Sequence, residues 1–226
     1  MILINPSFKI LSSINNEEIL KNIELAGRTC YKSEDKITKD SAKKFVKMIL
    51  DRGHESVIEH EKVTVKVICD RGVSHEIVRH RIASYSQEST RYCNYSKDKY
   101  GGYITFIIPC WFSEEAKSKI LEDNKIEVEI IVGNFAENLW VNHMLVCEKR
   151  YNSLIYEKWS PQQARSVLPN SLKTEIVITY NLREWRHFFK LRTSKAAHPQ
   201  MREIACPMLD KFKKSIPIIF DDIKYD

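Results

Sequence analysis

Hydrophobic side chains that recur every three or four positions predict helices along much of the chain. The clearest stripe lies in residues 38–51, and Gly53 follows it at the position of a C-terminal cap. An Asn-x-x-Glu pattern that begins at Asn15 favours a helix start. Further helices are predicted at 113–159 (one or two), from Ser160-Pro161, from Asn181 through Phe189 and at 201–212, with a short one capped by Ser74 and carrying 77–83.

Three segments have the pattern of strands. Residues 61–69 alternate valines with polar side chains, and residues 103–108 and 172–180 are rich in β-branched and aromatic residues. Because the strands and helices follow one another without regular βαβ alternation, an α+β fold is favoured, with helices covering a mostly antiparallel sheet. No linker or repeat interrupts the pattern, so residues 1–226 are predicted to form a single domain.

Composition limits the class of protein. The chain has 226 residues, of which 43% are hydrophobic and 29% charged, as is usual for a globular protein. No apolar run approaches the ~18–20 residues of a membrane span, and no signal peptide pattern opens the sequence. The six cysteines include no CxxC pair. We therefore predict a cytoplasmic protein with reduced thiols and no membrane association.

Glycine is scarce in this chain. The six glycines cannot form a GxGxxG or a GxxxxGK[ST] motif. A nucleotide would therefore be held without a Rossmann or P-loop cradle, and arginine side chains would bind its phosphates. The fold is accordingly predicted to be non-Rossmann.

Positive charge is concentrated in one part of the chain. Residues 149–202 hold eleven Lys and Arg against three acids, more than the whole net charge of +6. No basic block there exceeds two residues, so a pocket for anionic ligands is favoured. The alternative is a basic domain that grips RNA or single-stranded DNA through Arg and aromatic side chains. It accounts for the charge but not for the motifs described next.

Polar side chains are densest in residues 79–92, RHRIASYSQESTRY. Alone, Arg79-His80-Arg81 would be interpreted as a solvated basic turn. Hydroxyl, amide and guanidinium groups follow within a few positions, and together they suit an oxyanion such as phosphate. Such a composition disfavours both a core strand and a stable helix.

No metal site is predicted. His75-Glu76-x-x-Arg79 lacks the second histidine of an HExxH zinc motif. His80 would lie about 140° round a helix from His75, so the two rings would not converge on one ion.

The run of residues 79–89 resembles the RHRx7S signature of the flavin-dependent thymidylate synthases. Arg79-His80-Arg81 is followed by seven residues and then Ser89. Further segments resemble this family in the same order along the chain: His54-Glu55-Ser56 with Glu59-His60, QARSVLP at 163–169, Asn181-Leu182-Arg183, Leu191-Arg192 and His198-Pro199-Gln200. Ser86 stands where many members have Asn, and Glu76 where some have Gln.

The resemblance implies a reaction and an assembly. Members convert dUMP to dTMP with tightly bound FAD, and NADPH and methylenetetrahydrofolate are co-substrates. They use no covalent enzyme thiolate and form homotetramers whose active sites are shared between subunits. A nucleic-acid partner is not expected.

The resemblance also assigns roles to residues of this chain. Arg192 would be catalytic, because a cation facing the pyrimidine would stabilise negative charge on it. The residues implied to bind FAD are His54, Ser56, Arg79, His80, Arg81, Asn181, Leu182, Arg183 and His187. Those implied to bind dUMP are Glu76, Arg79, Gln87, Glu88, Ser89, Thr90, Arg91, Arg165 and Arg192.

Other functional readings of single residues are less favoured. Ser89 could be a phosphate ligand or a nucleophile, and no spacing identifies an activating base for it, which favours the ligand. Tyr92 and Tyr95 are expected to pack beneath the loop, and Cys206 to be a buried helical thiol. Trp185, Phe188 and Phe189 are expected to pack in the core.

Overall fold

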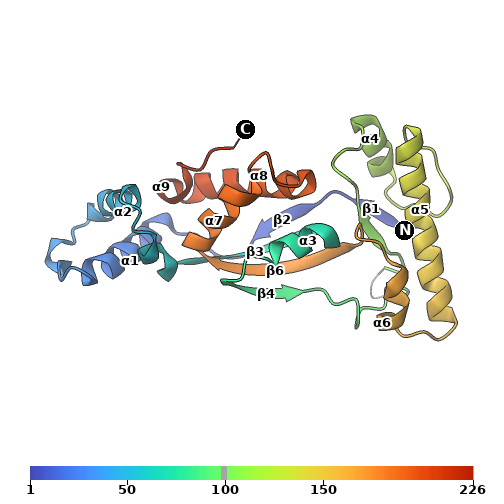
Figure 1. The fold of residues 1–226 in the computed structure, drawn as a ribbon, viewed down its shortest axis with the longest axis horizontal. Helices are drawn as coiled ribbons and strands as arrows, with labels where there is room; N and C mark the ends of the chain where they lie inside the picture. Colours follow the sequence, from blue (N-terminus) through green and yellow to red (C-terminus); the bar gives the residue numbers. More distant parts are fainter. Residues whose placement is uncertain (98–100, 226) are drawn as a thin grey trace. The chain divides into compact units, whose positions relative to one another are not determined.

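The computed structural model describes residues 1–97 and 101–225, in which helices and short strands follow one another irregularly (Figure 1). The strands are β1 Ile2–Ile4, β2 Ser7–Ile10, β3 Lys62–Asp70, β4 Ala83–Gln87, β5 Thr105–Ile107 and β6 Lys173–Asn181. The α-helices are α1 Asn16–Thr29, α2 Ser41–Asp51, α3 Arg71–Ile77, α4 Glu114–Glu122, α5 Phe135–Tyr156, α6 Pro161–Ala164, α7 Leu182–Arg192, α8 Pro199–Ser215 and α9 Pro217–Phe220. Short 3-10 helices are η1 Glu34–Lys36, η2 Glu55–His60 and η4 Arg165–Val167. Among these described helices, none combines the length and the hydropathy needed to cross a membrane.

The main sheet has the strand order β2-β3-β6-β4 and is mainly antiparallel. Alternate positions of β3 and β6 are buried, as the two-residue period of a strand requires. A second pair, β1 and β5, is parallel, with Leu3 opposite Phe106. The prediction of an α+β, non-Rossmann fold with a mostly antiparallel sheet is confirmed.

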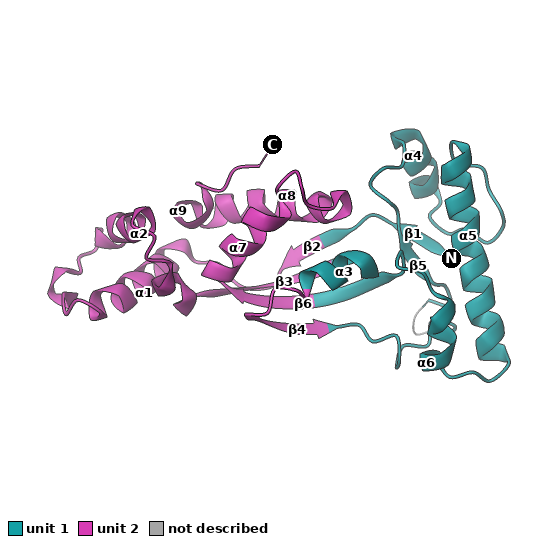
Figure 2. Ribbon diagram, in the orientation of Figure 1, with its two compact units in different colours: residues 1–7, 68–77, 87–176 teal, residues 8–67, 78–86, 177–226 magenta. Residues whose placement is uncertain are grey.

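The chain divides into two compact units (Figure 2). Unit 1 comprises Met1–Ser7, Ile68–Ile77 and Gln87–Ile176, and unit 2 comprises Phe8–Val67, Val78–Ser86 and Val177–Asp226. Strands β2, β3, β4 and β6 contribute residues to both units. That residues 1–226 act as one domain stays a prediction.

Unit 1 has its own hydrophobic core, in which α5 is the longest element. A capping box starts this helix: Asn134 Oδ1 accepts from the Glu137 amide, and Glu137 Oε2 accepts from the Asn134 amide. A Cβ on Gly133 would meet Glu137 Oε2 at 2.0 Å, so only glycine leaves room for this cap. The sequence left open one or two helices over residues 113–159, and the structure has two, α4 and α5.

Unit 2 is built on an aromatic core. Trp185, Phe188 and Phe189 on α7 are almost completely buried, which confirms their predicted packing role. The Trp185 ring lies 5.0 Å from that of Phe212 on α8, and its Nε1 donates to the Val63 carbonyl of β3. One face of α7 is thereby anchored, and its other side chains gain fixed positions.

The segment that joins α3 to β4 corrects one prediction. The helix expected over residues 77–83 is absent, because α3 ends at Ile77 and Ser74 is buried within it rather than capping it. Residues 83–87, whose composition disfavours a core strand, form β4 at the edge of the sheet, where none of its five residues is buried. Pairing with β6, reinforced by a 2.8 Å hydrogen bond between the Tyr85 and Tyr180 hydroxyls, outweighs the weak local preference.

Short elements were missed by the sequence patterns. Strands β1 and β2 have three and four residues, and α9 has four. A periodic pattern needs more residues than these to stand out.

Candidate functional site

Helix α7 carries several polar side chains of the candidate site, and a cap fixes where the helix starts. Asn181 Oδ1 accepts from the Glu184 amide at 2.8 Å, which confirms Asn181 as the N-cap. Glu184 therefore lies in the first turn, where a carboxylate interacts favourably with the helix dipole, and Arg192 lies in the last turn, where a cation does. The local sequence thus places a carboxylate and a guanidinium cation at opposite ends of one helix.

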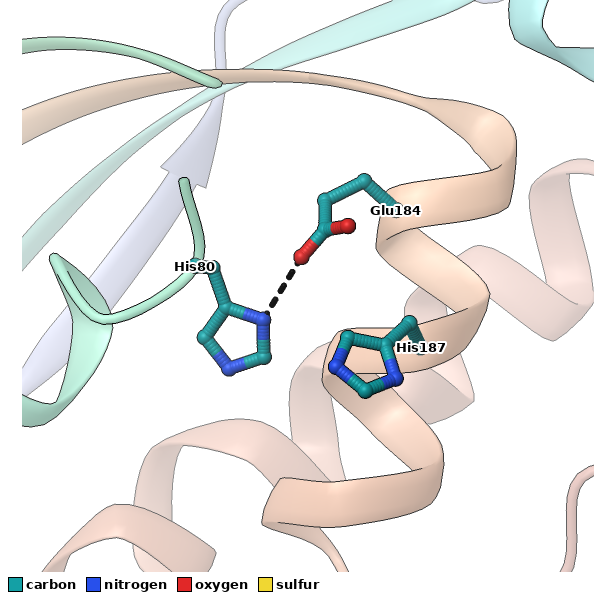
Figure 3. A group of neighbouring side chains, drawn as sticks. All are labelled: His80, Glu184 and His187. Carbon is teal, nitrogen blue, oxygen red and sulfur yellow. Dashed lines mark hydrogen bonds and ion pairs between the residues drawn. The ribbon is translucent and has the colours of Figure 1, made fainter. Parts of the chain in front are cut away.

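His80 connects these two ends. It follows α3 in a bend, and its ring turns toward Glu184 of α7, with His187 beside it (Figure 3). His80 Nδ1 lies 2.7 Å from Glu184 Oε1, and Arg192 Nε donates to His80 Nε2 at 3.2 Å. His80 and Glu184 are both buried, so water competes little for these contacts.

Burial also sets the charge of His80. Desolvation lowers the pKa of His80 below its ordinary value, and the neighbouring Arg192 and His187 act in the same direction. The hydrogen bond to Glu184 and its negative charge oppose this by raising the pKa. The net lowering favours a neutral ring at physiological pH.

The same residues have the donor set of a metal site. Within the part of the chain that the structure describes, ligand atoms of His80, Glu184 and His187 lie within 4.8 Å of one another. Both ring nitrogens of His80 are already engaged, one by Glu184 and the other by Arg192. A metal ion would have to displace one of these contacts, so hydrogen bonding accounts for the cluster without an ion.

A pocket of about 470 Å³ adjoins this group in unit 2. Its lining residues are Glu55, Glu59, Ile82, Asn181, Arg183, Glu184, His187 and Lys190. Arg183 Nη1 donates to Glu59 at 2.6 Å, and Lys190 Nζ lies 3.6 Å from Glu55. Three residues implied to bind FAD, namely Asn181, Arg183 and His187, are therefore brought together in one pocket wall.

The remaining residues implied to bind FAD differ in exposure. His54 and Ser56 are exposed at the start of η2, and Arg79 and Arg81 are exposed on either side of buried His80. Leu182 is fully buried, and its amide donates to the Glu61 carbonyl at 2.9 Å. None of these six residues lines the pocket described above.

In unit 1, the last residue of β4 and the loop after it carry most residues implied to bind dUMP. Gln87 Nε2 donates to the hydroxyls of Ser74 and Thr174, at 2.9 and 3.2 Å. The Glu88 carboxylate accepts from Tyr95 at 2.8 Å and from Lys173 at 2.9 Å. The hydrogen bonds of Gln87 and Glu88 thus hold the loop in its conformation.

The end of this loop is more open. Thr90 is buried, and its Oγ1 accepts from Arg165 Nη1 at 3.0 Å. Ser89 is half-buried, and its Oγ accepts from the Arg91 amide at 3.3 Å, while Arg91 and Arg165 are exposed. The structure therefore brings Arg165 to the loop across 75 positions of sequence. Glu76 is half-buried on α3.

The tyrosines beside the loop differ from each other. Tyr95 is 6% exposed and packs in the core of unit 1, as predicted. Tyr92 was expected to pack as well, but it is 76% exposed, with the Arg91 guanidinium 5.4 Å from its ring centre. The prediction for Tyr92 is wrong, because the turn at Ser89 directs its side chain to solvent.

Sequence reasoning missed Glu184 and Lys173. Glu184 had a local signal, because it is the third residue after the Asn181 cap, but its contact with His80 joins residues 104 positions apart. Lys173 forms ion pairs with both Glu88 and Glu175, and the local sequence pattern does not predict them.

Comparisons with known proteins identify the family of this chain. The model of the family described as thymidylate synthase complementing protein matches residues 10–218. Proteins named flavin-dependent thymidylate synthase from Corynebacterium efficiens and Geobacter sulfurreducens are each 32% identical to this chain. The first match covers 90% of this chain and 79% of the relative, and the second covers 88% and 80%.

A solved structure shares the fold. It is the UMP/dUMP methylase PolB from Streptomyces cacaoi bound with 5-Br dUMP, which matches with a TM-score of 0.72 and 22% identity over 98% of this chain and 96% of that one. The family match covers nearly all of both units and includes the signature of residues 79–89. This chain is similar to relatives named flavin-dependent thymidylate synthase over most of their length, and it belongs to the family described as thymidylate synthase complementing protein.

Proposed function

We propose that this protein is a flavin-dependent thymidylate synthase that reductively methylates dUMP to dTMP. Methylenetetrahydrofolate would donate the carbon, and NADPH would reduce tightly bound FAD. The observation that carries the proposal is the family match over residues 10–218, which contains the ordered signature from Arg79 to Ser89. A cytoplasmic location, as predicted from the sequence, is part of the proposal.

The donor chemistry of the unit 2 pocket fits an anionic dinucleotide. Arg183, His187 and Lys190 supply N–H donors to its wall, and Ile82 supplies an apolar surface for a ring. Glu59 pairs with Arg183 and Glu55 with Lys190, so an anionic ligand would replace these carboxylates as the partner of both cations. His54, Ser56, Arg79, His80, Arg81, Asn181 and Leu182 complete the residues proposed to hold FAD. When bound, the flavin supplies the hydride chemistry that amino-acid side chains lack.

The exposed groups of the unit 1 loop suit a nucleotide phosphate. Ser89 offers a hydroxyl donor, and Arg91 and Arg165 offer guanidinium groups that can bind phosphate with two hydrogen bonds. Gln87, Glu88 and Thr90 hold the loop in shape through the contacts described above. Glu76 and Arg79 are proposed to contact the same substrate.

Arg192 is proposed as the catalytic residue. Its guanidinium would face the pyrimidine and stabilise negative charge that develops there, which makes C5 of the base nucleophilic. Burial raises the pKa of the Cys69, Cys147 and Cys206 thiols, which disfavours these three as nucleophiles. From the family resemblance, we propose that the reaction forms no covalent bond between the substrate and an enzyme thiolate.

We further propose a homotetramer with shared active sites. Support comes from exposed apolar side chains at and before the start of α5, namely Val128, Ile131, Phe135 and Leu139, which are 61–83% exposed. A cluster of this kind is typical of a surface that a partner covers, and a second copy of the chain is the partner we propose.

The absorbance spectrum of the purified protein tests the function first. Oxidised flavin absorbs blue light, whereas a nucleic-acid-binding domain without cofactor does not. A dTMP-formation assay follows, from which NADPH, methylenetetrahydrofolate or dUMP is omitted in turn. Colourless protein that FAD does not activate, or dTMP formed without folate, would contradict the proposal.

Complementation tests the shared site. If Arg91 and Arg192 of one working site come from different chains, Arg91→Ala and Arg192→Ala tetramers should each be nearly inactive when dUMP is kept well below its KM. In hybrids made by co-expression, some sites would combine two intact arginines, so activity should exceed that of either parent. Hybrids as inactive as the parents would place both arginines in one chain.

A further inference from the structure

Glu184, His80 and Arg192 form a chain of hydrogen bonds within unit 2. Glu184 Oε1 lies 2.7 Å from His80 Nδ1, and Arg192 Nε lies 3.2 Å from His80 Nε2. The side chains of His80 and Glu184 are 2% and 9% exposed. Arg192 is eight residues beyond Glu184, about two turns along α7, so the imidazole bridges a distance that Glu184 cannot span itself.

The donors and acceptors of this chain fix the form of His80. Arginine has only N–H donors, so His80 Nε2 must accept and carries no proton. The proton of the neutral ring therefore lies on Nδ1 and is donated to Glu184. A doubly protonated ring would turn an N–H of His80 toward an N–H of Arg192, and the lowered pKa of His80 is consistent with its exclusion.

A carboxylate at position 184 selects this form. Because ionised Glu184 only accepts, it holds the proton on Nδ1 and leaves Nε2 as the acceptor for Arg192. A carboxylate on one ring nitrogen also makes the other a stronger acceptor. With glutamine at this position, the side chain could donate to Nδ1 instead, and the proton could move to Nε2, where it would repel Arg192.

We propose that Glu184 is a positioning residue that acts through His80 to orient the Arg192 guanidinium toward the substrate. The inference rests on the proposed function, in which Arg192 faces the pyrimidine. Glu184 itself touches His80 rather than the reacting atoms. Its contribution is to keep one tautomer of His80 and, through it, one orientation of Arg192.

A double-mutant cycle on the flavin-loaded enzyme tests the link. Glu184→Gln should lower kcat about 10- to 100-fold, the usual range for a residue that orients a functional group, with normal flavin content and circular dichroism. In an Arg192→Lys background, the same change should alter kcat by less than about twofold, because there is no guanidinium left to orient. Asp51→Asn, which removes a carboxylate from an exposed ion pair with Lys47, is the matched control and should leave kcat unchanged.

The pH profile gives a readout that a merely structural role would not move. The titratable and charged groups that face the His80 ring are Glu184, His187 and Arg192 on α7 and Tyr180 on β6, and the Tyr85 hydroxyl on β4 donates to the His80 carbonyl. Burial raises the pKa of both tyrosines, so they stay neutral where histidine titrates. Activity should fall on the acid side as His80 gains its second proton.

Glu184→Gln should move this acid limb to lower pH, since the Glu184 charge and hydrogen bond raise the pKa of His80. His80→Gln should remove the limb, whereas His187→Gln should retain it. If Glu184→Gln does not fold, Glu184→Asp replaces it in the cycle, because the shorter side chain keeps the charge but retracts from His80.

The outcomes separate the two proposals. Wild-type protein that forms no dTMP contradicts the proposed function. If wild-type protein forms dTMP, two results would overturn the positioning role alone. One is that the effects of Glu184→Gln and Arg192→Lys on kcat multiply independently, and the other is that Glu184→Gln leaves the acid limb of the pH profile in place. The positioning role is supported if the effects of the two substitutions on kcat are not independent and Glu184→Gln also shifts the acid limb of the pH profile.

Discussion

The α7 group of unit 2 and the loop after β4 of unit 1 organise their polar side chains in different ways. In the α7 group, Glu184, His187 and Arg192 belong to one rigid helix whose other face is held by an aromatic core. At the end of β4 and in the loop after it, Gln87, Glu88 and Thr90 are tied to side chains of other elements. A helix gives its functional groups fixed spacing, whereas a loop is held in shape by hydrogen bonds that occupy some of its own polar side chains.

This difference predicts which substitutions affect chemistry and which affect affinity. Orientation of a charged group on a helix bears on the transition state, and its loss should lower kcat. Hydrogen bonds from a loop to a phosphate are made equally to substrate and transition state, and their loss should appear in KM.

The largest effect is expected for Arg192→Ala. Removal of the cation that stabilises developing negative charge should lower kcat about 10²- to 10³-fold, the usual loss for one such group. Steady-state kinetics with saturating dUMP measures it, and Lys47→Ala on the exposed face of α2 is the control. A change confined to KM would contradict the distinction between the two regions.

Ser89→Ala should have a smaller effect, mainly on affinity. Loss of one hydrogen bond to a charged phosphate costs ~1.5–3 kcal/mol, or roughly 10- to 160-fold in the dUMP dissociation constant. Titration of dUMP against the flavin spectrum measures this constant. A fall in kcat beyond about 10⁴-fold with dUMP binding intact would instead identify Ser89 as a nucleophile.

Asp222→Asn tests how firmly α7 is anchored. The buried Arg186 guanidinium binds Asp222 through two hydrogen bonds of 2.6 and 2.7 Å and also binds Glu55 at 3.0 Å. Because Asp222 is half-exposed and Glu55 remains, we expect a loss of about 2 kcal/mol in the free energy of unfolding, below the ~3–5 kcal/mol of a fully buried pair. Denaturation by urea at neutral pH measures the loss.

The same pair predicts a pH dependence. The hydrogen bonds from Arg186 lower the pKa of Asp222 from its ordinary value of 3.8. Its stabilisation is therefore complete above the ordinary pKa and is lost as the pH falls through the lower pKa of the folded state. Asp222→Asn should flatten the fall in unfolding free energy below about pH 4. An identical acid slope in both proteins would show that the pair does not contribute.

The smallest effect is expected for Tyr95→Phe. The substitution removes the 2.8 Å hydrogen bond to Glu88 but keeps the buried ring, so about 1 kcal/mol of stability should be lost. Lys173 still holds Glu88, and the dUMP dissociation constant should rise by less than about tenfold. A loss of turnover comparable with that of Arg192→Ala would mean that the loop, too, acts in the chemical step.

Much of the fold and part of the site could be predicted because their signals are local. The capping of α7 by Asn181, the start of α1 after Asn15 and the alternation in β3 and β6 depend on residues a few positions apart. The strand β4 could not be predicted, because its stability comes from β6, almost a hundred positions away. The exposure of Tyr92 likewise follows from a turn whose backbone geometry the side chains do not encode.

The order of chemical groups along the chain determined the family resemblance, the absence of a Rossmann cradle and the residue types available for anions. Only the tertiary structure decided what those groups do to one another. It placed Glu184 against His80 across 104 positions, and His80 against Arg192 across 112. The physical reason is that hydrogen bonds and desolvation depend on distance in space, so the proton on His80 and the orientation of Arg192 are set by residues that no sequence window contains together.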